Sequence, residues 1–120
     1  MREIKFRGFN GEKWLFGNLD IDYKAKHACI SDNRFWRHPV RFETVGQFTG
    51  MYDADGREIY EGDVVRIDDW SSPSYIRWDD DTASFVVDRW AVNLAHVCYR
   101  KVIGNVHDNP GLLEAQNARD

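Results

Sequence analysis

The sequence is poor in cysteine, and its cysteines form no metal-binding pattern. Only Cys29 and Cys98 occur among the 120 residues, far apart and each in an apolar, strand-like segment. No CxxC pair is present, which excludes a zinc site built on cysteine pairs. We interpret both cysteines as small buried hydrophobic residues. A disulfide between them is the alternative, and a cytoplasmic location would disfavour it.

Other patterns of metal and enzyme sites are missing too. The four histidines are scattered, without the HxH or HExxH spacing of metal sites. The glycines form no phosphate-binding loop, and Ser71 and Ser72 lie in no nucleophile elbow. His96 and Cys98 are two residues apart on one segment, but no third group that would orient them is visible. We therefore expect no metal, no cofactor and no catalytic residues.

Long hydrophobic runs are absent as well. No window approaches the roughly 18 apolar residues that mark a membrane helix. Residues 1–7 carry charges where a signal peptide needs an apolar run. The formal net charge of −4 argues against a general binder of nucleic acid or anionic membranes. These absences predict a cytoplasmic protein that has no membrane partner.

Large apolar side chains are abundant, and many of them alternate with polar ones. The chain is 42% hydrophobic and 14% aromatic, which excludes a disordered protein. Ile4 and Phe6 alternate with charged residues, and Asn10-Gly11 predicts a type I′ hairpin turn into a second strand. Further strands are predicted over 28–30, 64–67, 75–78, 83–88 and 99–106.

The remaining segments complete the predicted architecture. The segment around Pro39 is predicted to be an edge strand or a loop, because proline cannot donate to a central ladder. Arg89 to His96 fits either a short helix or a loop. A short terminal helix is predicted to start near Asn109, with Asn109 as N-cap and Pro110 in the first turn. Short strands joined by turns about ten residues apart predict a mainly β fold, as a small closed or half-closed barrel.

Three ordered blocks of sequence point to a known family. They are residues 1–7 (MREIKFR), residues 49–65 (TGMYDADGREIYEGDVV) and residues 102–113 (VIGNVHDNPGLL). In this order and spacing the chain resembles the YopX family of phage and prophage proteins. The resemblance extends over essentially the whole chain, and only 22–45 and 70–96 follow no motif of their own.

The resemblance implies a fold and an origin but no chemistry. It implies a single mainly β domain over residues 1–115, an SH3-like barrel with flanking hairpin strands and a short C-terminal helix. Residues 116–120 are expected to form a polar tail. The family implies a phage-encoded protein that self-associates, in the cytoplasm of a bacterial host. It has no assigned activity, so no catalytic residue is carried over.

One acidic segment looks like the beginning of a calcium loop. Asp53-Ala54-Asp55-Gly56 has the first ligands, but a full EF-hand loop needs a bidentate Glu at its twelfth position, which here is Val64. We therefore interpret the segment as a hairpin turn in which Asp55-Gly56 adopts positive φ. The nearby carboxylates of Glu58, Glu61 and Asp63 are assigned structural roles.

A cluster of arginine and aromatic residues is the candidate interface. Interleaved arginines and aromatics suit base stacking with phosphate neutralisation. They equally suit a protein-interface hot spot, where Trp and Arg are enriched. The third interpretation is an ordinary amphipathic edge strand with solvated arginines. The residues are Arg34, Phe35, Trp36, Arg37, Arg41 and Phe42.

These observations favour a non-enzymatic phage accessory protein that acts by binding protein. The expected partners are a second copy of the chain and a host or phage protein. The alternative function is a nucleic-acid-binding module that uses the cluster at 34–42. A continuous positive groove through the three arginines of the cluster would favour nucleic acid, and an apolar patch would favour protein.

Overall fold

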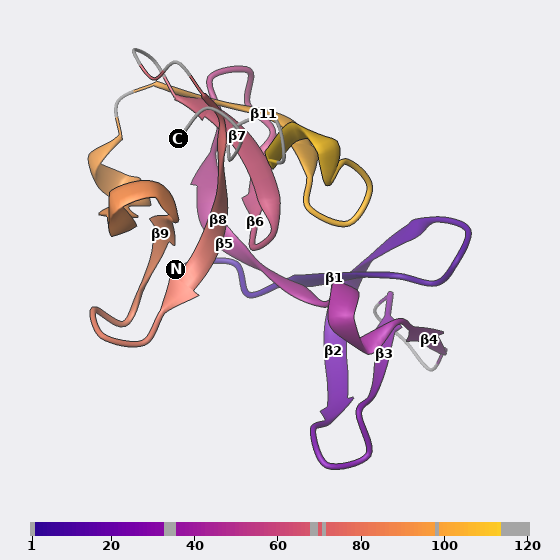
Figure 1. Cartoon of the computed structure of the whole chain (residues 1–120). Coiled ribbons are helices and arrows are strands. Elements are labelled where there is room, and N and C mark those ends of the chain that lie inside the picture. The colour runs from indigo at the N-terminus through magenta and orange to yellow at the C-terminus, as the bar shows by residue number, and fades with distance from the viewer. Residues whose placement is uncertain (1, 33–35, 68–69, 71, 98, 114–120) are drawn as a thin grey trace. The chain divides into compact units, whose positions relative to one another are not determined.

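The computed structural model describes residues 2–32, 36–67, 70, 72–97 and 99–113, and they are mainly β (Figure 1). Contacts between residues divide the chain into two compact units, unit 1 (Met1–Gly50) and unit 2 (Met51–Asp120). The strands form two antiparallel sheets, as expected for a mainly β protein. The described strands do not close into a barrel, so the SH3-like barrel stays a prediction, as does the single domain over residues 1–115.

Unit 1 is a curled antiparallel sheet in which β1 to β4 are neighbours in chain order and β5 pairs with β1. The order is β4-β3-β2-β1-β5, and a short 3-10 turn, Phe42–Thr44, precedes β5. The edge position of β4 confirms the prediction made from Pro39. The strands are β1 (Phe6–Phe9), β2 (Trp14–Asp22), β3 (His27–Ser31), β4 (Arg37–Val40) and β5 (Gly46–Tyr52).

The β1–β2 hairpin is where it was predicted, but its turn is of another type. Phe9 pairs with Trp14, so four residues form the loop. Gly11 has φ of 105°, whereas Asn10 does not have positive φ, so the type I′ turn was wrong. The Asn10 side chain explains the difference, because its Oδ1 accepts hydrogen bonds from the N–H groups of Glu12 (2.8 Å) and Lys13 (2.9 Å).

The sheet of unit 1 curls until the end of β4 lies against β1. The Arg41 N–H donates to the Phe9 carbonyl (2.8 Å), and the Phe9 N–H donates to Thr44 Oγ1 (2.9 Å). The Val40 side chain occupies the space beside Gly8, where an added Cβ would come within 2.6 Å of Val40 Cγ2. Glycine at position 8 therefore permits the curl.

Unit 2 contains the main hydrophobic core of the described residues. Its sheet has the order β10-β9-β8-β7-β11, and β6 is hydrogen-bonded to β5, whose last two residues belong to this unit. The strands are β6 (Glu58–Tyr60), β7 (Asp63–Ile67), β8 (Ser74–Asp79), β9 (Ser84–Val87), β10 (Val92–Asn93) and β11 (Arg100–Asn105).

The core side chains come from several strands of unit 2. Val65 and Ile67 point inward, with the exposed Arg66 between them, in the period of two of a strand. Two 3-10 turns, Arg89–Ala91 and Leu94–His96, flank β10. The segment from Arg89 to His96, for which a short helix or a loop was predicted, therefore consists of two short helical turns and a short strand. The core consists of Ile59, Val65, Ile67, Ile76, Val87, Leu94, Val97 and Val102.

The described chain ends in one helical turn, at residues 111–113, close to the predicted start. Asn109 is not its side-chain N-cap, because Asn109 Oδ1 accepts from the backbone N–H of Asn105 (3.2 Å). The predicted tail at 116–120 lies outside the described residues. None of the helical segments in the described part of the chain has the length and apolar character that a membrane crossing would need.

Candidate interaction surface

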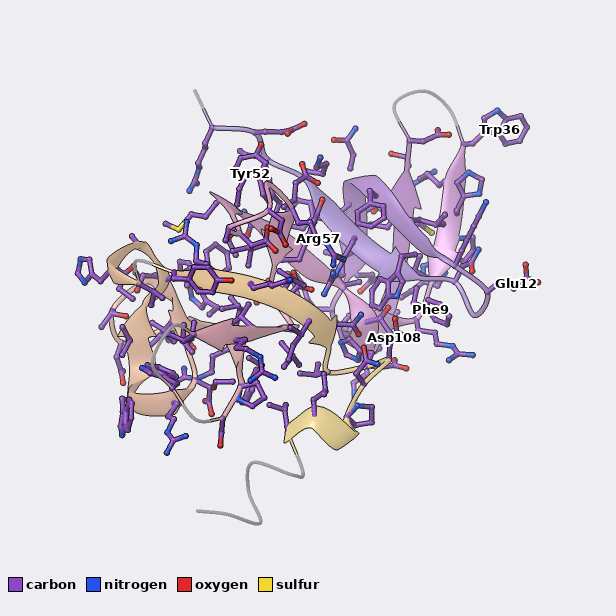
Figure 2. The ribbon with its side chains drawn as sticks, turned by 90° about the horizontal axis from the view of Figure 1, so that it is seen from above. Phe9, Glu12, Trp36, Tyr52, Arg57 and Asp108 are labelled. Atoms are coloured by element: carbon purple, nitrogen blue, oxygen red, sulfur yellow. The ribbon has the colours of Figure 1, made fainter. Side chains whose placement is uncertain are left out.

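The predicted interface lies on and beside the edge strand β4 in unit 1. Trp36, directly before β4, is 72% exposed, and its side chain points away from the ribbon (Figure 2). Arg37 and Arg41 are exposed and Phe42 is half-buried. Arg34 and Phe35 lie outside the described residues. The structure therefore places four of the six predicted residues, and Trp36 is the most exposed apolar side chain among those four.

The other three side chains make contacts within unit 1. Arg37 forms an ion pair with Asp20 of β2. The Arg41 guanidinium lies over the Phe9 ring, 5.5 Å from its centroid. Phe42 makes an edge-to-face contact with Tyr23, with ring centroids 6.3 Å apart. Arg37, Arg41 and Phe42 thus contact three different residues and do not form one cluster. The sequence did not indicate these contacts, because the partners lie in other segments of the chain.

The outer edge of β4 is interrupted by Pro39. In the register with β3, Pro39 is the partner of Cys29. Because proline has no N–H, this pairing places its nitrogen on the outer edge, where an added strand would need a donor. Proline on an edge strand is a known protection against strand addition. Recognition at β4 therefore has to use side chains more than the backbone.

A hollow of about 360 Å³ lies in unit 1 on the side of the loop at 10–13. Its apolar lining comes from β2 and β3, and its polar lining comes from the loop, from β4 and from Asp32, which follows β3. The sequence analysis missed it, because the hollow depends on the curl of the sheet and on no local pattern. Its lining residues are Asn10, Lys13, Leu15, Phe16, Ile30, Asp32 and His38.

In unit 2 the acidic segment at 53–56 is a turn held by Asp53. Asp53 is 7% exposed. Its Oδ1 accepts from the N–H groups of Asp55 (2.9 Å) and Arg57 (2.8 Å), and its Oδ2 accepts from the Val102 N–H (3.0 Å). The turn was predicted correctly in position, but only Gly56 has positive φ, at 83°, so positive φ at Asp55 was wrong.

Burial and hydrogen bonding act on the Asp53 carboxyl in opposite directions. Burial favours the neutral form and raises the pKa. The backbone hydrogen bonds from Val102, Arg57 and Asp55, with the charge of Arg57, outweigh burial and hold the pKa of Asp53 below 3.8. Asp53 is therefore a charged acceptor that ties the turn to β11.

The other acidic and sulfur-containing candidates also make local contacts. Asp63 Oδ2 accepts from the Tyr60 N–H (2.8 Å), and Glu58 Oε1 accepts from the Tyr60 hydroxyl (3.0 Å). Cys29 is free and half-buried, so its full burial was wrong, and Cys98 lies outside the described residues. Within the described ranges no group of three His, Cys, Asp or Glu side chains is suited to a metal ion.

Unit 2 also exposes tryptophans, and Trp78 and Trp90 each contact a half-buried aromatic ring. Trp70 and Trp90 meet edge to face with centroids 5.0 Å apart, and Trp78 and Phe85 do so at 5.1 Å. Trp90 is 70% exposed and has φ of 62°, a left-handed conformation that is rare for a bulky residue. Trp90 is therefore close to Trp36 in exposure and differs from it in having an aromatic contact on the described surface.

Comparison with known proteins gives a family. The sequence profile of the family described as YopX protein matches residues 5–114, nearly the whole chain. No curated protein sequence matches the chain.

Proposed function

Because this chain belongs to the YopX family, we propose that it is a phage-encoded accessory protein that acts by binding another protein and not by catalysis. The proposal places it in the cytoplasm of the bacterial host and includes the SH3-like barrel that the family implies. Trp36 carries the proposal. An indole that is 72% exposed beside an edge strand is the side chain type that dominates protein interfaces.

The contacts around Trp36 support side-chain docking. Pro39 interrupts the outer edge of β4, so a partner gains little from adding a strand. Arg37 is held beside the interface by Asp20. A fixed arginine next to an exposed tryptophan loses less side-chain entropy when a partner binds.

The same ion pair weighs against the nucleic-acid alternative. Asp20 neutralises the charge that Arg37 would bring to a phosphate, and the Arg41 guanidinium lies over Phe9. Arg37 therefore adds little to the continuous positive groove that nucleic-acid binding needs. Arg34, the third arginine, lies outside the described residues.

The partner that we propose first is a second copy of the chain. In a two-fold dimer each copy offers the same patch, so one exposed tryptophan on each copy is buried at the same time. A host or phage protein that binds the same surface is the second partner of this proposal.

Sedimentation of the wild type and two matched tryptophan variants tests the proposal. We expect an oligomeric wild type and a Trp36→Ala variant whose self-association is at least about 30-fold weaker, the effect of losing a hot-spot tryptophan. Trp90→Ala removes an equally exposed tryptophan from unit 2 and should leave the assembly unchanged. A wild type that is monomeric at high micromolar concentration would refute self-association, and tight binding of an oligothymidylate would favour the alternative function.

A further inference from the structure

We propose that the hollow in unit 1 is a docking site for an acidic peptide segment that contains an aromatic residue, supplied by a partner protein. This inference rests on the proposed function, protein binding through unit 1, and assigns a second site and the chemistry of its ligand. The argument uses the floor of the hollow, its charged rim and the charge of the unit around it.

The floor of the hollow is apolar and suits an aromatic ring. Leu15 and Phe16 from β2 and Ile30 from β3 line it. Phe16 is 47% exposed and Ile30 is 1% exposed, so Phe16 supplies more of the apolar surface than Ile30 does. The volume of about 360 Å³ lies at the lower end of the range for ligand pockets, which suits one large side chain better than a whole cofactor. Aromatic side chains gain most from such a site, because they bury a large area with few rotatable bonds.

The rim is of mixed charge, and Arg41 adds a second cation close to it. Lys13 of the loop at 10–13 and His38 of β4 both line the hollow and are exposed. The Arg41 side chain reaches the same loop, since an added Cβ on Gly11 would lie 3.5 Å from Arg41 Nη2. Asp32 is the acidic member of the lining. Carboxylates on either side of the ligand's aromatic residue would meet Lys13 and Arg41, while the ring enters the floor.

The charge of the surrounding unit favours the same ligand. Residues 1–50 contain nine Lys and Arg and six Asp and Glu, a net charge of +3 in a protein whose total is −4. A positive unit attracts an acidic segment and raises its rate of association.

Titration with labelled five-residue peptides tests the inference. The first peptide has tryptophan flanked by two aspartates on each side, and two others replace the tryptophan by alanine or the aspartates by lysine. We expect saturable binding of the first peptide in fluorescence anisotropy, with a dissociation constant below about 1 mM. Both changed peptides should bind at least about fivefold more weakly.

Two lysine variants connect the binding to the hollow. Lys13→Glu should weaken binding of the acidic peptide about tenfold, because it replaces attraction by repulsion at the rim. Lys24→Glu changes an exposed lysine of the same unit that does not line the hollow and should have little effect. Equal effects of the two variants, with unchanged melting temperatures, would show general charge attraction and overturn the site. Absence of binding to the wild type, or equal binding of the lysine peptide, would overturn the inference too.

The Trp36→Ala variant separates this inference from the proposed function. It should bind the acidic peptide as the wild type does, because Trp36 does not line the hollow. Loss of self-association with retained peptide binding supports both statements. A monomeric wild type that binds the peptide refutes only the proposed self-association, and a self-associating wild type that does not bind it refutes only the hollow.

Discussion

Units 1 and 2 differ in charge and in what their polar groups do. Unit 1 has a net charge of +3, whereas unit 2 has seven Lys and Arg and fourteen Asp and Glu, a net charge of −7. In unit 2 the best-buried carboxylates, Asp53 and Asp63, accept hydrogen bonds from the backbone of their own unit. In unit 1 cations lie over aromatic rings, as the exposed Arg41 does over Phe9 and the buried Arg7 does over Trp14. Unit 2 contains the main hydrophobic core of the described residues, and unit 1 contains both surfaces that we propose for binding.

The largest effect is expected from removing the Asp53 side chain, which tests whether the two units differ in this way. Asp53→Ala leaves three N–H groups without their acceptor and should lower the free energy of unfolding of unit 2 by about 3 kcal/mol. Hydrogen exchange read by mass spectrometry should show faster exchange in β7 and β11, and little change in β1 to β4.

Asp55→Ala is the matched control, since it removes an exposed neighbour whose ion pair with Lys101 is 3.6 Å long. It should change stability by less than about 1 kcal/mol. If Asp53→Ala speeds exchange equally in both units, the two units do not differ in the way that we infer.

Gly8→Ala tests unit 1 in the same way, by adding an atom where Asp53→Ala removes several. The new methyl group would lie 2.6 Å from Val40 Cγ2, so either the curl or the packing of β4 must change, at a cost of about 1–3 kcal/mol. Faster hydrogen exchange should be confined to unit 1 and accompanied by weaker binding of the acidic peptide.

The second-site change Val40→Ala should restore part of the loss by making room beside position 8. Gly111→Ala serves as the control, because an added Cβ there meets nothing within 4 Å. A Gly8→Ala protein with wild-type exchange and peptide binding would contradict the role given to this close contact.

The smallest effect is expected when the pH is changed, and it tests whether the charged form of Asp53 stabilises unit 2. The pKa of Asp53 is lowered in the folded protein, so the charged form adds stability above the unfolded value of 3.8. That contribution is lost as the pH falls through the folded pKa. The difference in unfolding free energy between the wild type and Asp53→Ala, from urea titrations, should therefore be constant above about pH 5 and shrink below pH 4. A difference that grows with acid would mean that the pKa is raised instead.

The sequence predicted the strands better than it predicted what joins them. Alternation of apolar residues identified β2 and β7, because the period of two is a local property of a half-buried strand. At β1 the position was predicted but the alternation was wrong, since Ile4 lies outside the strand and is exposed while Arg7 is buried. The turn types were predicted less well from the sequence. At Asn10 and Asp53 a side-chain oxygen accepts backbone hydrogen bonds, and a prediction of φ from two adjacent residues does not include such bonds. The residue types therefore predicted where the turns lie but not their backbone geometry.

The candidate site was predicted only in part for a similar reason. Trp36 could be recognised as a candidate from its neighbours in the chain. The ion pair of Arg37 with Asp20 and the hollow beside Lys13 both depend on strand register and on the curl at Gly8. These are contacts between residues far apart in sequence, and a single sequence contains no local signal for them.

Pro39 has a consequence for the size of any assembly. Open-ended stacks of β-strands, the arrangement in amyloid fibrils, grow because every outward backbone group of an exposed edge finds a partner in the next chain. The nitrogen of Pro39 has no hydrogen to offer at the middle of β4. A protein that exposes aromatic residues risks precipitation, and this one position disfavours fibrillar growth from β4 while leaving Trp36 exposed.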